Sequence, residues 1–292
     1  MTKVARYVKA ASAAGALEAK RADPSAAYLA GGTYVLAGDG RDKPESVIDL
    51  AAALPRGLIR DGAVLTIGAG TTFREMAESK DAPRCIVEAA LTMVNRNTRN
   101  RGTLGGNLGA DKSCSSMLPI LIALEAEVEV VSTSSPAPRR VELEAWLRGR
   151  EPGLGATPAV SAKTDSSDLL LRVLVPIKEG RRAAYRRWNR VSCDLSVLGA
   201  AAAYELEASP KGSPSGGAVR GLRIALGGLG PKARRFPALE ALFQGRPLPS
   251  REEIEAAAAP LLKPIDDLRA SAAFKRLRGA QLLADALIEA AP

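Results

Sequence analysis

Histidine is absent from this chain of 292 residues, and its absence excludes several kinds of chemistry. It rules out His-ligated metal centres, Ser-His-Asp and Cys-His nucleophilic catalysis, and a cofactor linked through histidine. The three cysteines, Cys85, Cys114 and Cys193, are too far apart for an iron–sulfur or zinc signature, and we expect free thiols in a reducing compartment. Acid–base chemistry would need Asp, Glu, Lys, Tyr or Cys, or a bound cofactor.

Aromatic residues and long hydrophobic runs are also scarce. Aromatics make up 4% of the chain, too few for a platform that stacks nucleic-acid bases, so we expect no nucleic-acid partner although the net charge is +9. An anionic cofactor or an acidic partner subunit would also fit this charge. No apolar run approaches the length of a membrane span, and the first residues lack the apolar core of a signal peptide. We therefore predict no membrane span and a cytoplasmic location.

The remaining composition is that of a globular protein with one large domain or two ordinary ones. Short apolar runs predict strands at Ser46–Leu50, Ala63–Gly70 and Leu169–Pro176. Thr71 or Thr72 is placed to cap a helix. We place a domain boundary after residue 177, which gives a first domain at 1–177, with subdomains at about 1–55 and 56–177, and a second at 178–292.

The C-terminal segment predicts an amphipathic helix. Its apolar residues recur at helical spacing and are expected to share one buried face: Phe274, Leu277, Ala280, Leu283 and Leu287.

Two segments with paired glycines carry the functional signal. They are Ala30–Leu36, "AGGTYVL", and Gly102–Leu108, "GTLGGNL", and both are expected to be turns. Paired glycines permit positive φ angles and let the backbone approach a ligand closely, and successive N–H groups can then hold an anion. Neither segment matches the P-loop or the dinucleotide-binding G-x-G-x-x-G pattern. From the residues alone, each is either a plain turn or part of an anion-binding domain.

A family resemblance narrows these alternatives. The pieces "YLAGGTYVL", "SVIDL", "LTIGAGTTFREMAES", "NTRNRGTLGGNL" and "LPILIALEAEVEVVS" resemble, in order and spacing, the FAD-binding medium subunits of the molybdenum hydroxylases, the flavoproteins of xanthine dehydrogenase and carbon monoxide dehydrogenase. In the second half, "YRRWNRVSCDLSVLGAAA", "LRIALGGLGPKARR" and "DLRASAAFKRLRGAQLL" resemble the C-terminal domain of the same subunits. The resemblance implies an α+β fold, with a two-subdomain FAD-binding domain of the vanillyl-alcohol oxidase (PCMH) type followed by a small α+β domain.

The resemblance also implies roles for particular residues. One loop on the FAD pyrophosphate would comprise Leu29, Ala30, Gly31, Gly32, Thr33, Tyr34, Val35 and Leu36. A second, reaching the phosphates and ribityl chain, would comprise Thr103, Leu104, Gly105, Gly106 and Asn107. Arg187 falls where the family often has a lysine beside the flavin. Met93 and Leu170 fall near positions that pack on the cofactor, and ordinary core packing explains them equally well.

The sequence departs from the family at two places. The family often has an aspartate nine residues beyond the asparagine of the second loop, where this chain has Ser116. Asp111 or Ser115 could supply the missing contact. The segment at 148–168 also looks longer than the usual connection.

The function implied is that of a FAD-dependent oxidoreductase subunit. FAD would be bound noncovalently, while [2Fe–2S] clusters and the molybdenum cofactor would belong to a small and a large partner subunit of a heterotrimer. Electrons would pass from the clusters through FAD to NAD⁺, a quinone or oxygen. No side chain is assigned as a catalytic acid or base, and no metal ligand is expected in this chain.

Two alternatives stay open at this point. One is a stand-alone FAD reductase or oxidase of the same fold, and the other is a non-catalytic scaffold that has lost FAD. The sequence does not specify the substrate, the electron acceptor or the oligomeric state.

Overall fold

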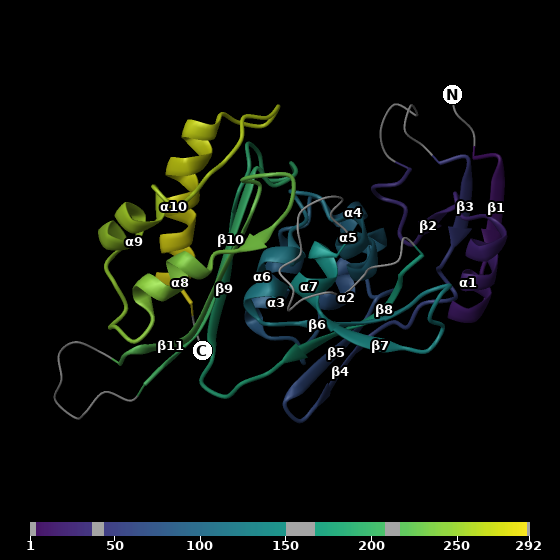
Figure 1. The fold of residues 1–292 in the computed structure, drawn as a ribbon, viewed down its shortest axis with the longest axis horizontal. Coiled ribbons are helices and arrows are strands. Elements are labelled where there is room, and N and C mark those ends of the chain that lie inside the picture. Colours follow the sequence, from purple (N-terminus) through teal and green to yellow (C-terminus); the bar gives the residue numbers. More distant parts are fainter. Residues whose placement is uncertain (1–3, 37–43, 150–166, 208–216, 291–292) are drawn as a thin grey trace. The chain divides into compact units, whose positions relative to one another are not determined.

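The computed structural model describes residues 4–36, 44–149, 167–207 and 217–290, which form two compact units (Figure 1). Unit 1 comprises residues up to 82 together with 95–110 and 126–175, and unit 2 comprises 83–94, 111–125 and 176 onward. Two segments of the first half of the chain therefore fold with the second half.

Unit 1 contains two sheets with a common core. In the described residues, the parallel strands β1 (Arg6–Lys9), β3 (Ser46–Asp49) and β2 (Ala27–Leu29) form one sheet in that order. The second sheet has the order β4-β5-β8-β6-β7, with β4 at Leu58–Asp61, β5 at Val64–Gly68, β8 at Leu169–Pro176, β6 at Glu127–Val131 and β7 at Arg139–Glu142. Leu17, Ile48 and Leu169 are buried in one cluster that joins the two sheets. The strands predicted around 46–50, 63–70 and 169–176 are confirmed.

Short helices complete unit 1: α1 (Ala13–Ala22), α2 (Phe73–Ala77), α4 (Arg96–Arg101), α5 (Leu104–Ala110) and α7 (Leu143–Arg148). Thr72, one of the two predicted caps, begins α2, where its hydroxyl accepts from the N–H of Glu75 at 3.2 Å. The Glu75 carboxylate in turn accepts from the Thr72 N–H at 2.7 Å. This capping box satisfies two N–H groups at the start of a helix that is only five residues long.

Unit 2 is a sheet covered on both faces. The antiparallel strands β9 (Arg182–Trp188), β10 (Leu198–Leu206), β11 (Val219–Gly227) and β12 (Arg234–Arg235) lie between two sets of helices (Figure 1). One set is α8 (Pro237–Phe243), α9 (Arg251–Ala258) and α10 (Ala272–Ile288), and the other is α3 (Arg84–Leu91) and α6 (Met117–Ala123). Because helices cover both faces, the alanines at 200–203 of β10 are all fully buried, and the segment has no polar alternation.

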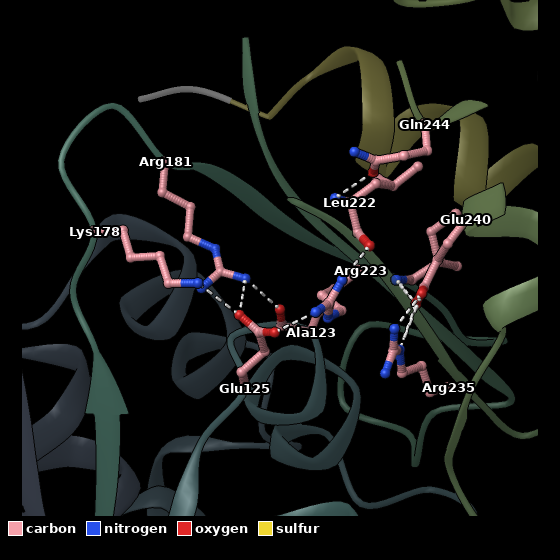
Figure 2. A network of polar contacts seen from close by, with 10 residues as sticks. Ala123, Glu125, Lys178, Arg181, Leu222, Arg223, Arg235, Glu240 and Gln244 are labelled. Carbon is pink, nitrogen blue, oxygen red and sulfur yellow. Dashed lines mark hydrogen bonds and ion pairs between the residues drawn. The ribbon is translucent and has the colours of Figure 1, made fainter. Parts of the chain in front are cut away.

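One carboxylate joins three parts of unit 2. Glu125 follows α6 in the left-handed region at φ 58°. Its carboxylate lies 2.8 Å from the Lys178 Nζ, 3.0 Å from an Arg181 nitrogen and 2.6 Å from an Arg223 nitrogen (Figure 2). Arg181 also donates to the Ala123 carbonyl at 3.1 Å. The end of α6, the segment before β9 and strand β11 are thereby held to one another.

Two sequence-based predictions need correction. In the segment predicted as a turn at Gly102–Leu108, only Gly102 and Thr103 connect α4 to α5, whereas the residues from Leu104 on form the start of α5, and the Leu104 and Gly105 amides donate to neighbouring backbone carbonyls. The predicted buried face of the last helix is also partly wrong. Phe274 and Leu277 are 37% and 61% exposed, whereas Lys275 is completely buried. The reason is that the turn before α10 packs on this end of the helix and gives the lysine two partners there.

Candidate anion-binding site in unit 1

The first glycine segment is a tight turn that follows β2. A Cβ built on Gly31 would lie 1.9 Å from the carbonyl oxygen of Arg101 and 2.7 Å from its carbon. Gly32 has a φ angle of 72°, which residues other than glycine rarely adopt. A side chain at position 31 would therefore collide with the backbone at the end of α4. A side chain at position 32 would be incompatible with the backbone conformation of that residue.

Backbone N–H groups of this turn have no acceptor within the described part of the chain. This applies to Gly31, Gly32 and Thr33, which are consecutive, whereas the Leu36 N–H donates to the Gly32 carbonyl at 3.2 Å. The three residues are partly or fully exposed. Consecutive unsatisfied N–H groups on a glycine turn can donate hydrogen bonds to the oxygens of a pyrophosphate. The residues present thus fit the phosphate portion of FAD.

The second glycine segment already uses its amides within the protein. The Leu104 N–H donates to the Thr71 carbonyl at 2.9 Å and the Gly105 N–H to the Ala69 carbonyl at 2.8 Å. The Gly106 N–H donates to the Thr103 hydroxyl at 3.1 Å. A Cβ on Gly105 would lie 2.8 Å from that of Ala69, so this glycine permits α5 to pack on the end of β5.

The two segments meet in space. A Cβ on Gly106 would lie 3.9 Å from the Ala30 Cβ, and one on Gly102 would lie 3.4 Å from the Thr33 hydroxyl. Gly106 is exposed, and Asn107 is partly exposed. The structure therefore brings together the two segments that the sequence singled out, with the first supplying free N–H groups and the second a packed surface beside them.

Arginines add positive charge next to this site. Arg96, Arg99 and Arg101 lie on α4, and the carbonyl of Arg101 is the group that Gly31 contacts. Sequence reasoning did not assign these residues, although the run "RNTRNR" directly precedes the second glycine segment. Positive charge on a neighbouring helix raises the potential at the site and favours the arrival of an anion.

The other predicted site residues are distributed over both units. Leu170 is buried in β8 of unit 1. In unit 2, Met93 is partly exposed after α3, and Arg187 lies on β9 and donates to the Ser192 carbonyl at 2.8 Å. Ser116 precedes α6 and is 3% exposed, and its hydroxyl has no partner within the described residues. The cofactor contacts assigned to these residues stay predictions.

Asp111 and Lys232 form a polar pair in the same part of unit 2. The Asp111 backbone is left-handed at φ 45°, one of its carboxylate oxygens lies 2.5 Å from the Lys232 Nζ, and the other oxygen is buried with no partner in the described chain. Sequence reasoning considered Asp111 and missed Lys232, which is 121 residues away.

Unit 2 also buries a tyrosine and a cysteine. Burial raises the pKa of Tyr185 to about 12 and that of Cys85 to about 11, so both are neutral at physiological pH. The described residues hold no cluster of three or more His, Cys, Asp or Glu side chains suited to a metal ion. Within the same residues, no helix combines the length and apolarity needed to cross a bilayer.

The protein has an α+β fold with a glycine turn suited to an anion, and comparisons identify its family. Residues 2–178 match the FAD binding domain in molybdopterin dehydrogenase, and residues 183–290 match the CO dehydrogenase flavoprotein C-terminal domain. The chain therefore belongs to the family of FAD-binding flavoproteins of molybdopterin dehydrogenases, as the motifs predicted.

Individual relatives are similar to this chain over most of its length. A putative xanthine dehydrogenase FAD-binding subunit, XdhB, of Escherichia coli K12 is 30% identical over 284 residues, which are 93% of this chain and 90% of that protein. The carbon monoxide dehydrogenase medium chain of Hydrogenophaga pseudoflava is 26% identical over 254 residues, with 84% and 81% covered. A solved carbon monoxide dehydrogenase structure from Hydrogenophaga pseudoflava superimposes with a TM-score of 0.84 at 26% identity, covering 99% of this chain and 98% of that one. The predicted α+β flavoprotein fold is confirmed.

Proposed function

We propose that this chain is the FAD-binding electron-transfer subunit of a molybdenum hydroxylase complex. The observation that carries the proposal is the turn of Gly31, Gly32 and Thr33, whose consecutive N–H groups have no acceptor among the described residues and lie beside the second glycine segment. FAD would supply the redox chemistry, accepting electrons from iron–sulfur clusters and passing them on. The chain's own task is to bind and orient this cofactor.

Specific residues would hold FAD. The N–H groups of the Leu29–Leu36 loop would bind the pyrophosphate, while Thr103–Asn107 would pack beside it and place the Asn107 amide near the ribityl chain. The arginines of α4 would attract the anionic cofactor. Contacts from Ser116, Leu170 and Arg187 belong to the same proposal. The cofactor would be noncovalent, since the chain has no histidine for a histidyl link.

The partners would be an iron–sulfur small subunit and a large subunit with the molybdenum cofactor, in a cytoplasmic complex. This extends to the present chain what the names of its relatives state, because several are medium chains or FAD subunits of dehydrogenases. NAD⁺, a quinone or oxygen would be the final acceptor. The division of the chain at residue 177 would separate the part that binds the phosphates from the C-terminal flavoprotein domain.

The first test is the visible absorption spectrum of the purified chain before and after acid precipitation. We expect a flavin spectrum that moves completely into the supernatant, because no covalent link holds the cofactor. A protein that stays colourless after FAD is added would contradict the proposal and favour the scaffold alternative. Flavin that binds to a chain forming no complex with iron–sulfur and molybdenum subunits would favour a stand-alone enzyme.

Charge on α4 gives a kinetic prediction. The double variant Arg96→Gln and Arg101→Gln should slow FAD association about 3-fold to 10-fold at low salt, because positive potential near a site accelerates the arrival of an anion. The difference should shrink at high salt, where exposed charges are screened. Stopped-flow quenching of flavin fluorescence measures the rate. Arg60→Gln, which removes an exposed charge on β4 of the same unit, is the matched control and should change little.

A further inference from the structure

Leu268 in unit 2 is completely exposed, with a relative accessibility of 103%. It lies at the tip of the turn Ile265–Ala270, which leads into α10. Single exposed leucines are common on protein surfaces and need no explanation by themselves. This one differs because the turn that carries it is held rigidly.

A buried lysine fixes the turn. Lys275 on α10 is 0% exposed, and its Nζ lies 2.7 Å from an Asp267 carboxylate oxygen and 3.1 Å from the Ile265 carbonyl oxygen. Burial of an ammonium group is costly unless it is paired and hydrogen-bonded, so these two contacts tie the turn to the helix. The Ile265 N–H, in addition, donates to the Leu229 carbonyl at 2.9 Å.

Side-chain caps rigidify the remainder of the turn. The other Asp267 oxygen accepts from the N–H groups of Arg269 and Ala270 at 2.9 and 3.2 Å. The Asp266 carboxylate accepts from the Ala272 N–H at 2.6 Å, at the start of α10. These hydrogen bonds hold the backbone of the turn on both sides of Leu268 and present its apolar side chain to solvent on an ordered support.

Further exposed apolar side chains lie on the elements that adjoin this turn, the start of α10 and the loop after β9. Phe274 stacks on Trp188 with ring centroids 4.7 Å apart, so the start of α10 is joined to the end of β9. The loop after β9 lies nearby: the pKa of Asp194 is lowered, mainly by the Leu195 N–H and Arg190 and also by the charge of Arg269. We call the exposed apolar set the Leu268 surface; it consists of Val191 (59% exposed), Leu195 (45%), Leu268, Phe274 (37%) and Leu277 (61%).

Charge around this surface is mainly positive. Arg190 pairs with Asp194, and Lys275 with Asp267, so these four charges cancel. Among the charged residues that flank this turn in sequence, Lys263, Arg269 and Arg276 remain against Asp266. An apolar centre with an arginine rim is the composition that protein interfaces favour, and a rim of this sign is complementary to an acidic face.

We propose that the Leu268 surface docks a partner subunit of the same complex, whose contact face is acidic and contains an apolar pocket for Leu268. The proposal rests on the proposed function, because the complex supplies the partner. Leu268 is the anchor, and Lys275 preorganises the turn that presents it, which lowers the entropy lost on binding.

Cys193 provides a direct test, because it lies within the loop between Val191 and Leu195 and is exposed, whereas Cys85 is buried and Cys114 partly so. The rate of its alkylation by N-ethylmaleimide is measured by peptide mass spectrometry. The chain is studied alone and in the complex co-produced with its iron–sulfur and molybdenum subunits. We expect about tenfold or greater protection in the complex. An unchanged rate in the complex would overturn the proposal. It would also be overturned if the rate in the isolated chain fell as the chain concentration rose, because a second copy would then be the occupant.

Matched substitutions identify the anchor. Leu268→Glu should weaken assembly about tenfold or more, as for a central contact residue, with an unchanged unfolding temperature because the side chain packs on nothing. Leu242→Glu, on α8 towards the other end of α10 (Figure 1), also places a carboxylate at an exposed leucine and should leave assembly unchanged. Equal effects of the two variants would contradict the assignment. Lys275→Met should weaken assembly by an intermediate factor, because the turn loses the contacts of the ammonium group with Asp267 and the Ile265 carbonyl.

The flavin spectrum separates this proposal from the proposed function. Leu268→Glu should retain FAD at wild-type stoichiometry in the isolated chain. If the wild-type chain binds FAD but forms no complex, the docking proposal fails and FAD binding stands. If the complex assembles through this surface without flavin, the proposed function fails and the docking proposal stands.

Discussion

Replacement of Gly31 by alanine is expected to abolish tight FAD binding. The new Cβ would lie 1.9 Å from the Arg101 carbonyl oxygen, a distance that no packing adjustment of a side chain relieves, because the contact is with backbone. The turn must move away from α4, and the three N–H groups that we assign to the pyrophosphate move with it. We expect the affinity for FAD, measured by titration with fluorescence detection, to fall about 100-fold or more, which corresponds to about 2.7 kcal/mol.

Gly109→Ala is the matched control for this experiment. It makes the same change in α5, and its Cβ would meet nothing within 4 Å. Alanine is favoured over glycine within a helix by about 0.5–1 kcal/mol, so this variant should be as stable as the wild type or more so, with unchanged FAD affinity. A Gly31→Ala protein that folds and binds FAD as the wild type does would show that the turn is not the pyrophosphate site.

Glu125→Gln is expected to destabilise unit 2 by about 2 kcal/mol at neutral pH. Lys178, Arg181 and Arg223 converge on the Glu125 carboxylate, and the side chain of Arg181 is only 4% exposed (Figure 2). Burial alone would raise the pKa of Glu125, but the hydrogen bond from Lys178 and the charges of the two arginines outweigh it and lower the pKa to about 2. The estimate of about 2 kcal/mol is below the full value of the shift, because solvent still reaches about a quarter of the side chain.

This substitution also predicts a pH dependence. The pKa of Glu125 in the folded state is below the ordinary value of 4.5, so its contribution is complete above pH 4.5 and is lost as the pH falls toward 2. The difference in unfolding free energy between wild type and Glu125→Gln should therefore be constant from pH 7 to 5 and vanish near pH 2. Urea titrations at several pH values measure it. Glu179→Gln, an exposed neighbour of Lys178, should show no such difference. Equal stability of Glu125→Gln and wild type at pH 7 would refute the role of the network.

Local patterns were sufficient where neighbouring residues decide the structure. Thr71 or Thr72 was predicted as a helix cap, and Thr72 is the cap because its partner, Glu75, is only three residues away. Apolar runs likewise predicted β3, β5 and β8. The glycine segments were recognised from their composition, and the family was identified from their order and spacing.

Local sequence patterns gave wrong predictions where residues that are distant in the chain decide the structure. Gly102–Leu108 was predicted as a turn, yet its residues from Leu104 on form the start of a helix whose first amides donate to carbonyls of Ala69 and Thr71. Phe274 and Leu277 were predicted on the buried face of the last helix, yet the end of that face is exposed and Lys275 is buried instead, paired with Asp267 and the Ile265 carbonyl. Lys232 gave no signal at all, because its partner Asp111 is more than a hundred residues away in the chain.

The sequence by itself determined the α+β class, the flavoprotein family and the two glycine segments, because these depend on residue types and their short-range order. Tertiary structure decided which glycine faces backbone and which N–H groups find no acceptor among the described residues. It also decided that 83–94 and 111–125 fold with the C-terminal half, and that Glu125 joins three parts of unit 2. The physical reason is that a close backbone contact, a buried ion pair or an unsatisfied donor is a property of two groups brought together by folding, and no single stretch of sequence contains both.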